Sequence, residues 1–336
     1  MHTQYEDRRR VRRTIIILSI SFAVLIIVYL LGTKIEKNQA YQERGNLKED
    51  FSTYKRVKYD GKTYRRKNSI MPILLIGIDK YDEDIESVSY RNGGQADFIM
   101  LIVIDDRERT VHLLQIDRDT MTNFVVLGVL GDEIGTRYSQ ICLSHGFGNN
   151  PAQNCEYTLK AVNNLLGSEE IEFYIAMNLD SICVINDYLG GVTVKIEDDF
   201  SWIDPTMVIG ESVKLAGKQA EYYVRTRIGM SESSNAARMR RQKEYITAVV
   251  LQLSSMFENN MIYAENILTD LEPYFFTNLD IAEIFSEIIG SYGYLVEEVV
   301  SFPGKHVIGE DGFVEFYPDN DSVIKWVLDV LYKEEN

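Results

Sequence analysis

Two apolar runs joined by a short charged segment constrain the fold of this 336-residue chain more than any other stretch. They are Phe98–Ile104 and Thr110–Ile116, both rich in Ile, Val and Leu, and residues 105–109 between them are all charged. Strand-length runs of this composition with a short polar connection predict a β-hairpin. The chain should therefore contain a buried sheet that includes this hairpin.

The open end of the hairpin predicts a polar site at the edge of that sheet. Folding would bring Asp97 next to residues 117–119, which read Asp-Arg-Asp. Asp79 ends a third apolar run, residues 72–79, whose continuous Ile and Leu content is typical of a buried central strand. If that strand neighbours the hairpin, Asp79 and Asp97 face each other, and two carboxylates with a substrate phosphate can hold Mg²⁺. The alternative is that each aspartate caps a strand or a turn.

Arginines recur in a pattern further along the chain. Arg225 and Arg227 are two residues apart, so in an extended segment they would point to one face. Arg238, Arg241 and Gln242 are three and four residues apart, so on the long helix predicted there they would share one side. A single helix arginine usually belongs to a solvated face. Gathered at element ends of an acidic chain, these arginines predict phosphate binding, because a guanidinium donates two parallel hydrogen bonds and keeps its charge.

Composition and motifs exclude several function classes. The net charge of -16 and the pI of about 4.8 disfavour a general nucleic-acid binder, which would present a basic face. The sequence contains neither G-x-S-x-G nor H-E-x-x-H, and its GFGN segment is not a P-loop. With 45% hydrophobic residues the chain can bury a large core, in one sizeable domain or two small ones.

The N-terminal residues predict a membrane anchor. Residues 1–13 carry five arginines, and residues 14–33 contain no charge. About 20 apolar residues suffice to span a bilayer as a helix, and arginines before it place the N-terminus in the cytoplasm. A cleaved signal peptide is the alternative, although no A-x-A-like site follows. We expect a single pass through the plasma membrane, a stalk at residues 34–68, and an extracellular domain at residues 69–336.

Strands mixed with helices along the outer part predict one α/β domain with a mixed central sheet flanked by helices. Beyond the segments named above, strands are predicted at 172–178, 192–196 and 294–302, and helices at 154–166, 179–189, 216–223, 236–253, 280–290 and 322–332. Cys142 and Cys155 flank a Gly/Asn/Pro loop and could form a disulfide outside the cytoplasm, or could remain reduced and buried. Cys183 lies among apolar residues and is expected in the core.

Several segments, in this order, resemble the LytR-CpsA-Psr family of Gram-positive bacteria. The likeness covers roughly residues 70–251, and the predicted anchor and outer domain also fit the topology of that family. The Gly-Gly-Val-Thr-Val, Arg-Thr-Arg and Arg-x-x-Arg-Gln pieces together are specific. The segments are LLIGID at 74–79, QADFIMLIVID at 95–105, IDRDT at 116–120, QICLSHGFG at 140–148, YLGGVTV at 188–194, AGKQAEYYVRTR at 216–227 and NAARMRRQ at 235–242.

The resemblance implies a membrane-anchored transferase. Such proteins move a phosphate-linked glycopolymer, for example wall teichoic acid or capsule, from a polyprenyl-pyrophosphate carrier to peptidoglycan. By motif, Asp79 and Asp97 would hold Mg²⁺, and Asp119 would orient Arg118 or assist the metal site. Mg²⁺ and the arginines would stabilise charge on the transferring and leaving oxygens. The residues implied to bind pyrophosphate are Arg118, Arg225, Arg227, Arg238, Arg241 and Gln242.

Three neutral residues depart from the family pattern. Gln95 stands where an arginine is usual, Gln140 where a lysine is common, and Asn235 where an acidic residue often precedes the helix. We interpret this as altered substrate handling, because both metal aspartates and all six phosphate ligands remain. The alternatives are a non-catalytic binder of polyprenyl phosphates and a hydrolase of the carrier linkage.

Overall fold

The computed structural model describes residues 55–79, 93–128, 132–167, 169–226, 235–259, 267 and 270–335. The chain divides into two compact units, Met1–Val57 and Lys58–Asn336. The anchor predicted at residues 14–33 lies outside the described residues, and so does Arg227. No helix within the described ranges is both long and apolar enough to cross a bilayer.

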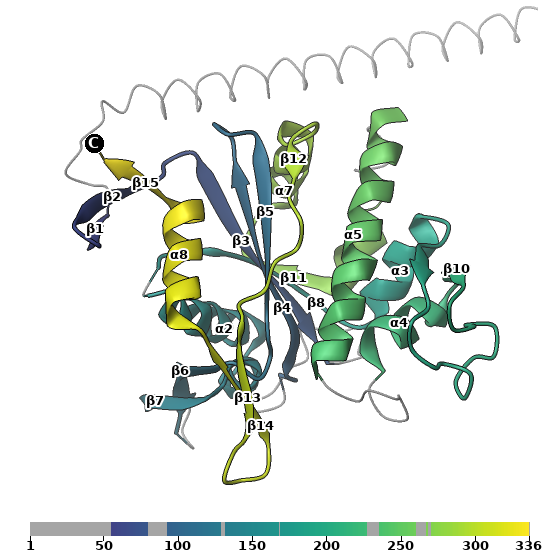
Figure 1. Cartoon of the computed structure of the whole chain (residues 1–336), viewed down its shortest axis with the longest axis horizontal. Helices are drawn as coiled ribbons and strands as arrows, with labels where there is room; N and C mark the ends of the chain where they lie inside the picture. Colours follow the sequence, from purple (N-terminus) through teal and green to yellow (C-terminus); the bar gives the residue numbers. More distant parts are fainter. Residues whose placement is uncertain are drawn as a thin grey trace, which may run out of the picture. The chain divides into compact units, whose positions relative to one another are not determined.

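A six-stranded mixed sheet forms the centre of the second unit (Figure 1). In order across the sheet, its strands are β11 (Phe275–Thr277), β8 (Phe173–Met177), β3 (Ile70–Ile78), β4 (Ala96–Asp105), β5 (Thr110–Ile116) and β12 (Leu295–Val296). β3 pairs antiparallel with β4 and parallel with β8, and β4 pairs antiparallel with β5. The predicted mixed sheet and the predicted hairpin are therefore confirmed.

The central strands are buried on both faces. Ile73 and Leu74 are adjacent in β3, so their side chains point to opposite faces, yet both are buried. Helices cover each face of a sheet in this arrangement, and the strands between them then read as continuous apolar runs. This explains why residues 72–79 show no polar alternation.

Helices lie on both sides of the sheet, with α2 and α8 on one side and α3, α4 and α5 on the other (Figure 1). α7 shares a face with α5, because Ile284 of α7 packs with Ile73 while Ile246 of α5 packs beside Leu75. The helices are η1 (Ile141–Phe147, 3-10), α2 (Pro151–Leu165), α3 (Asp180–Tyr188), α4 (Lys218–Arg225), α5 (Asn235–Asn259), η2 (Glu272–Tyr274, 3-10), α7 (Ile281–Gly290) and α8 (Asn320–Leu331).

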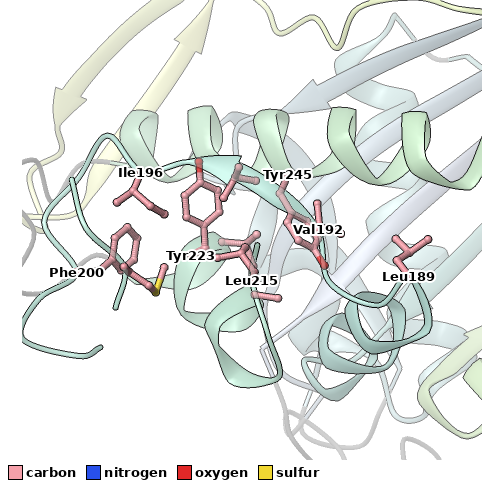
Figure 2. Close-up of a cluster of buried hydrophobic side chains, with 11 residues drawn as sticks. Leu189, Val192, Ile196, Phe200, Leu215, Tyr223 and Tyr245 are labelled. Atoms are coloured by element: carbon pink, nitrogen blue, oxygen red, sulfur yellow. The ribbon is translucent and has the colours of Figure 1, made fainter. Parts of the chain in front are cut away.

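A second hydrophobic core holds α4 and α5 in place. It combines side chains of α3, α4 and α5 with those of the antiparallel pair β9 (Thr193–Lys195) and β10 (Ser212–Lys214) (Figure 2). Phe200 and Tyr223 stack at 5.8 Å between ring centroids within it. Because α4 and α5 carry the candidate phosphate-binding arginines, this core fixes where those arginines lie.

Short strands complete the unit at its periphery. β2 pairs antiparallel with β15, so the folded unit begins before the predicted boundary at Ser69 and includes part of the predicted stalk. These strands are β1 (Arg56–Tyr59), β2 (Lys62–Arg66), β6 (Met121–Leu127), β7 (Glu133–Gln140), β13 (Gly304–Ile308), β14 (Val314–Pro318) and β15 (Tyr332–Glu335).

Two sequence expectations need correction. Arg225 is the last residue of α4 and not part of an extended segment, because the helix continues two residues beyond its predicted end. The strand predicted at 294–302 shortens to β12, with one further isolated bridge between Leu114 and Val300. Cys142 and Cys155 do not form a disulfide: both are free thiols and both are buried. Cys183 is also a free thiol and is half-buried.

Candidate functional site

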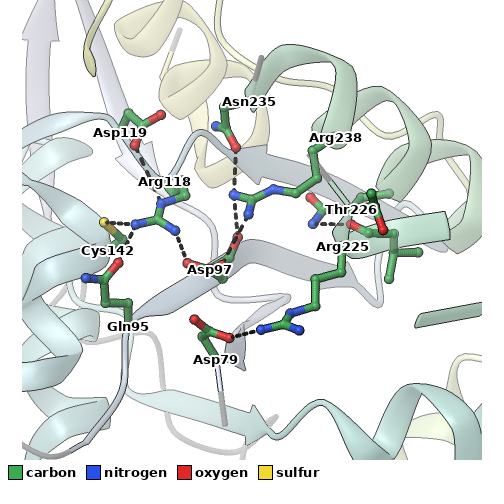
Figure 3. A network of polar contacts seen from close by, with 12 residues as sticks. Asp79, Gln95, Asp97, Arg118, Asp119, Cys142, Arg225, Thr226, Asn235 and Arg238 are labelled. Atoms are coloured by element: carbon green, nitrogen blue, oxygen red, sulfur yellow. Dashed lines mark hydrogen bonds and ion pairs between the residues drawn. The ribbon is translucent and has the colours of Figure 1, made fainter. Parts of the chain in front are cut away.

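Arg118 lies at the open end of the β4–β5 hairpin, where the sequence places it, and it contacts four groups (Figure 3). Its two terminal nitrogens donate to Asp97 Oδ1 and to Gln95 Oε1, and one of them also lies 3.2 Å from Cys142 Sγ. Its Nε lies 3.5 Å from Asp119 Oδ1, which is an ion-pair distance. Arg118 is therefore held in one orientation at the sheet edge.

The thiol beside Arg118 stays protonated. Burial raises the pKa of Cys142 to about 11, and the Arg118 guanidinium offsets that rise only in part. A protonated thiol is a poor nucleophile and a poor metal ligand. Cys142 therefore lines this site as an uncharged side chain.

Asp97 joins Arg118 to a second arginine from α5. Arg238 Nη1 lies 3.2 Å from Asp97 Oδ2, and Arg238 Nη2 donates to Asn235 Oδ1 at 2.6 Å. The Arg238 side chain is only 2% exposed, whereas that of Asp97 is 17% exposed. The arginine is thus buried behind a carboxylate that solvent or a ligand can reach.

A more exposed ion pair completes the cluster. Arg225 Nη2 lies 2.7 Å from Asp79 Oδ1, with side chains 39% and 41% exposed. Asp79 and Asp97 sit at adjacent strand ends, since Ile78 pairs with Ala96. The two aspartates therefore lie at the ends of neighbouring strands, which was the condition for the expected Mg²⁺ site.

The side chains present fit a Mg²⁺ ion whose remaining ligands come from water and substrate. Two aspartates lie at adjacent strand ends, but no group of three His, Cys, Asp or Glu side chains suited to a metal occurs among the described residues. Mg²⁺ is usually held by one or two carboxylates together with water and substrate phosphate. Three arginines (Arg118, Arg225, Arg238) already balance three aspartates (Asp79, Asp97, Asp119), so a bound dication would call for an anionic ligand.

The structure separates two residues that the sequence groups with this cluster. Arg241 Nη1 lies 2.5 Å from Asp198 Oδ2, and its Nε donates to the Tyr223 carbonyl at 2.8 Å. Its third nitrogen donates to the Thr226 carbonyl. Arg241 therefore faces the second core and not the Asp97 cluster.

Gln242 borders the site without joining the ion pairs. Its amide nitrogen donates to the Val224 carbonyl at 3.2 Å, and its oxygen accepts from Gln115 at 2.9 Å. Together with Arg238 it lines the groove described below.

The three neutral departures each have a defined partner. Gln95 accepts a hydrogen bond from Arg118, where a second arginine would place like charges together. Gln140 donates to the Val314 carbonyl at 3.2 Å. Asn235 donates to Asp117 Oδ1 at 2.7 Å while it accepts from Arg238. Gln95 and Asn235 thus complete the hydrogen bonds of charged side chains, whereas Gln140 bonds to a backbone carbonyl.

An apolar groove of about 280 Å³ begins at this cluster and runs between the sheet and α3 and α5. Asp97, Arg225 and Arg238 lie among its lining residues, and the other lining residues are mostly apolar. The sequence did not delimit this groove, because its walls come from seven elements that are spread along the chain. The aliphatic side chains that line it include Leu75, Met100, Leu113, Ile182, Ile185, Ile246 and Val249.

Comparison with known proteins places this site in a family. A model described as the LytR_cpsA_psr family matches residues 26–302. Curated relatives are named polyisoprenyl-teichoic acid–peptidoglycan teichoic acid transferase TagU. The one from Bacillus anthracis is 26% identical over 87% of this chain and 89% of its own length. The one from Halalkalibacterium halodurans is 27% identical over 60% of each chain, so this match spans less than two thirds of that relative.

Solved structures share the fold. Bacillus subtilis TagV matches with a TM-score of 0.61 and 22% identity, over 79% of this chain and 98% of that one. Protein gbs0355 from Streptococcus agalactiae matches with a TM-score of 0.63 and 20% identity, over 80% and 90%. At this level of identity the likeness concerns the fold.

Proposed function

This chain belongs to the LytR_cpsA_psr family, and we propose that it is a membrane-anchored transferase. It would move a phosphate-linked glycopolymer from a polyprenyl-pyrophosphate carrier to peptidoglycan in cell wall biogenesis. The names of its relatives, which specify a polyisoprenyl-linked teichoic acid and peptidoglycan, support this choice of donor and acceptor.

The observation that carries the proposal is the junction of an apolar groove with a cluster of arginines. A polyprenyl pyrophosphate has an apolar tail and a strongly anionic head, and the groove offers aliphatic walls next to Arg225 and Arg238. Arginine forks bind phosphate oxygens with charge-assisted hydrogen bonds, which are stronger than neutral ones. One ligand of this class would satisfy both regions at once.

Each arginine has a separate task in this mechanism. Arg118 and Arg238 flank Asp97, so a phosphate that displaced their carboxylate contacts would be held from two sides. Exposed Arg225 would bind the outer phosphate and release it most easily with the carrier. Positive groups fixed before the reaction stabilise the charge that develops on the leaving phosphate.

Asp79 and Asp97 would hold the Mg²⁺ ion, which when bound supplies Lewis-acid stabilisation of the phosphate oxygens. Asp119 would keep Arg118 in place when Asp97 helps to hold the ion. Arg227 is a further candidate ligand of pyrophosphate. Residues 14–33 would anchor the chain, with this domain outside the plasma membrane.

The test uses the full-length chain in detergent with Mg²⁺, a polyprenyl-pyrophosphate-linked sugar and a peptidoglycan fragment. Asp97→Ala and Arg118→Ala should each lower turnover about 100-fold or more, because a preorganised charged contact to the transition state is lost. Arg107→Ala is the matched control, since it removes an exposed arginine from the closed end of the same hairpin. Undiminished turnover in both site variants would contradict the proposal.

A non-catalytic binder of polyprenyl phosphates is the second candidate. The ion pairs of Asp97 with Arg118 and of Asp79 with Arg225 favour it, because they already occupy the carboxylates that would hold Mg²⁺. The same assay separates the two functions, since a binder would retain the lipid without consuming it. Release of phosphate without acceptor would identify a hydrolase.

A further inference from the structure

A second cavity, of about 300 Å³, is lined by a different face of α5 from the one that lines the groove. Met239, Arg240 and Lys243 of α5 line this cavity, whereas Arg238 and Gln242 line the groove. Residues three and four apart share a helix face, so the first turns of α5 present one face to each cavity. We call the second cavity the His306 pocket; its lining residues include Gln115, Asp117, Met239, Lys243, Ser301, Phe302, His306 and Phe316.

A buried carboxylate holds the imidazole of this pocket. His306 Nε2 lies 2.8 Å from Asp117 Oδ2, and the Asp117 side chain is 6% exposed. Asp117 Oδ1 in turn accepts from Asn235 at 2.7 Å and from the Asp119 amide at 2.8 Å. His306 is itself 38% exposed, so a fixed polar ring faces accessible space.

Aromatic rings form the apolar walls of the pocket. His306 and Phe316 are paired across β13 and β14, with ring centroids 4.6 Å apart. Phe302 lines the pocket nearby and packs edge-on against Trp326 at 6.2 Å. Flat rings beside hydrogen-bonding groups such as Gln115 and Ser301 suit a ligand with both apolar faces and hydroxyls.

The charges in the pocket disfavour a polyanion. Arg240 is already engaged by Asp198 at 3.2 Å and by Glu197 at 3.5 Å. Asp117 is a fixed negative charge in the wall, and Lys243 is exposed at the rim. The balance fits a hydroxyl-rich ligand of low charge, such as a saccharide.

A continuous set of contacts connects the pocket to the arginine cluster. Asn235 donates to Asp117, which holds His306, and accepts from Arg238, which contacts Asp97 (Figure 3). The side chains of Asp117, Asn235 and Arg238 therefore connect His306 to Asp97 at the proposed phosphate site. The groove, which is lined by another face of α5, remains available to a lipid tail.

We propose that the His306 pocket binds the acceptor saccharide of the transfer, with His306 as a hydrogen-bonding residue positioned by Asp117. This inference rests on the proposed function. Donor lipid and acceptor sugar would then occupy separate cavities on two different faces of α5.

The test measures acceptor use and acceptor binding with the full-length chain in detergent. The probe is a soluble peptidoglycan disaccharide-peptide, and the variants are His306→Ala and the pocket-filling Ser301→Trp. Lys305→Ala is the matched control, because Lys305 is adjacent on β13 but points to the other face of the hairpin. His306→Ala should raise the KM for the acceptor about fivefold or more, which is the loss of about one hydrogen bond.

The KM for the donor should stay within about twofold of wild type in both variants, because the Asp97 cluster is unchanged. An unchanged KM for acceptor in His306→Ala and Ser301→Trp would overturn the inference while leaving the proposed function intact. If wild type does not consume donor in the presence of acceptor, the proposed function fails, and calorimetric binding of the same fragment then tests the pocket by itself. Binding lost in both variants and kept in Lys305→Ala supports the pocket, and equal or undetectable binding in all of them overturns it.

Discussion

Two arginines of α5, three residues apart, serve different regions of the molecule. Arg238 contacts Asp97 at the edge of the sheet, and Arg241 contacts Asp198 beside the second core. Both side chains are 2% exposed, but Asp97 is 17% exposed and Asp198 only 6%. Arg241 also donates to two backbone carbonyls. Burial alone therefore does not mark a binding arginine, and the accessibility of its partner distinguishes the two.

Arg241→Ala should produce the largest loss of stability. Asp198 would lose its closest ion-pair partner in a buried position, a change that costs about 3–5 kcal/mol. Urea denaturation of the chain would measure this change in the free energy of unfolding. Arg240→Ala, which removes a 44% exposed arginine from the same Asp198, should stay within about 1 kcal/mol. A loss below about 1 kcal/mol in Arg241→Ala would show that the Arg241–Asp198 pair does not stabilise the fold in this way.

Arg238→Ala should act mainly on activity. Turnover of the polyprenyl-pyrophosphate donor should fall about 100-fold, because one of the two arginines that flank Asp97 is gone. Asp97 keeps Arg118, so the loss of stability should be smaller than that in Arg241→Ala. Paired turnover and denaturation measurements on both variants would decide. Equal activity in the two variants would show that the regions are not distinct.

Asn235→Asp should have an intermediate effect on stability. The new carboxylate would lose the hydrogen bond to Asp117 and lie beside that carboxylate, at a cost of about 1–3 kcal/mol. Asn320→Asp is the matched control, because Asn320 is also the first residue of a helix but is exposed, and the helix dipole favours an acid there. Thermal denaturation of the two variants should show a lower Tm only for Asn235→Asp.

The smallest effect concerns thiol chemistry. Burial raises the pKa of Cys142, beside Arg118, to about 11, so at pH 8 nearly all of this thiol is protonated and unreactive. Cys183 of α3 is less buried, although burial raises its pKa as well. Labelling of the native chain with iodoacetamide, followed by peptide mass spectrometry, should therefore modify Cys183 before Cys142. Faster labelling of Cys142 would show that solvent enters the Arg118 region more easily than the second core.

Local patterns predicted a large part of the fold. The β4–β5 hairpin was visible because its strands are adjacent in sequence and its turn residues are all charged. One further apolar run predicted the strand that ends in Asp79, but only the pairing of β3 with β4 showed that it neighbours Asp97. Arg225 was misplaced on an extended segment, because the end of α4 depends on packing against α5 and the second core.

The sequence by itself determined the central strands β3, β4, β5 and β8, most of the helices and the charged residues at their ends, because hydrophobic periodicity and turn chemistry act over a few residues. The short peripheral strands, such as β2 and β15, were not predicted. It also carried the family segments, which the match over residues 26–302 confirmed. Only the tertiary structure decided that Arg238 meets Asp97 while Arg241 meets Asp198. Residues three apart on a helix point about 60° from each other, and which partner each one meets is set by surfaces that join only when distant segments pack together.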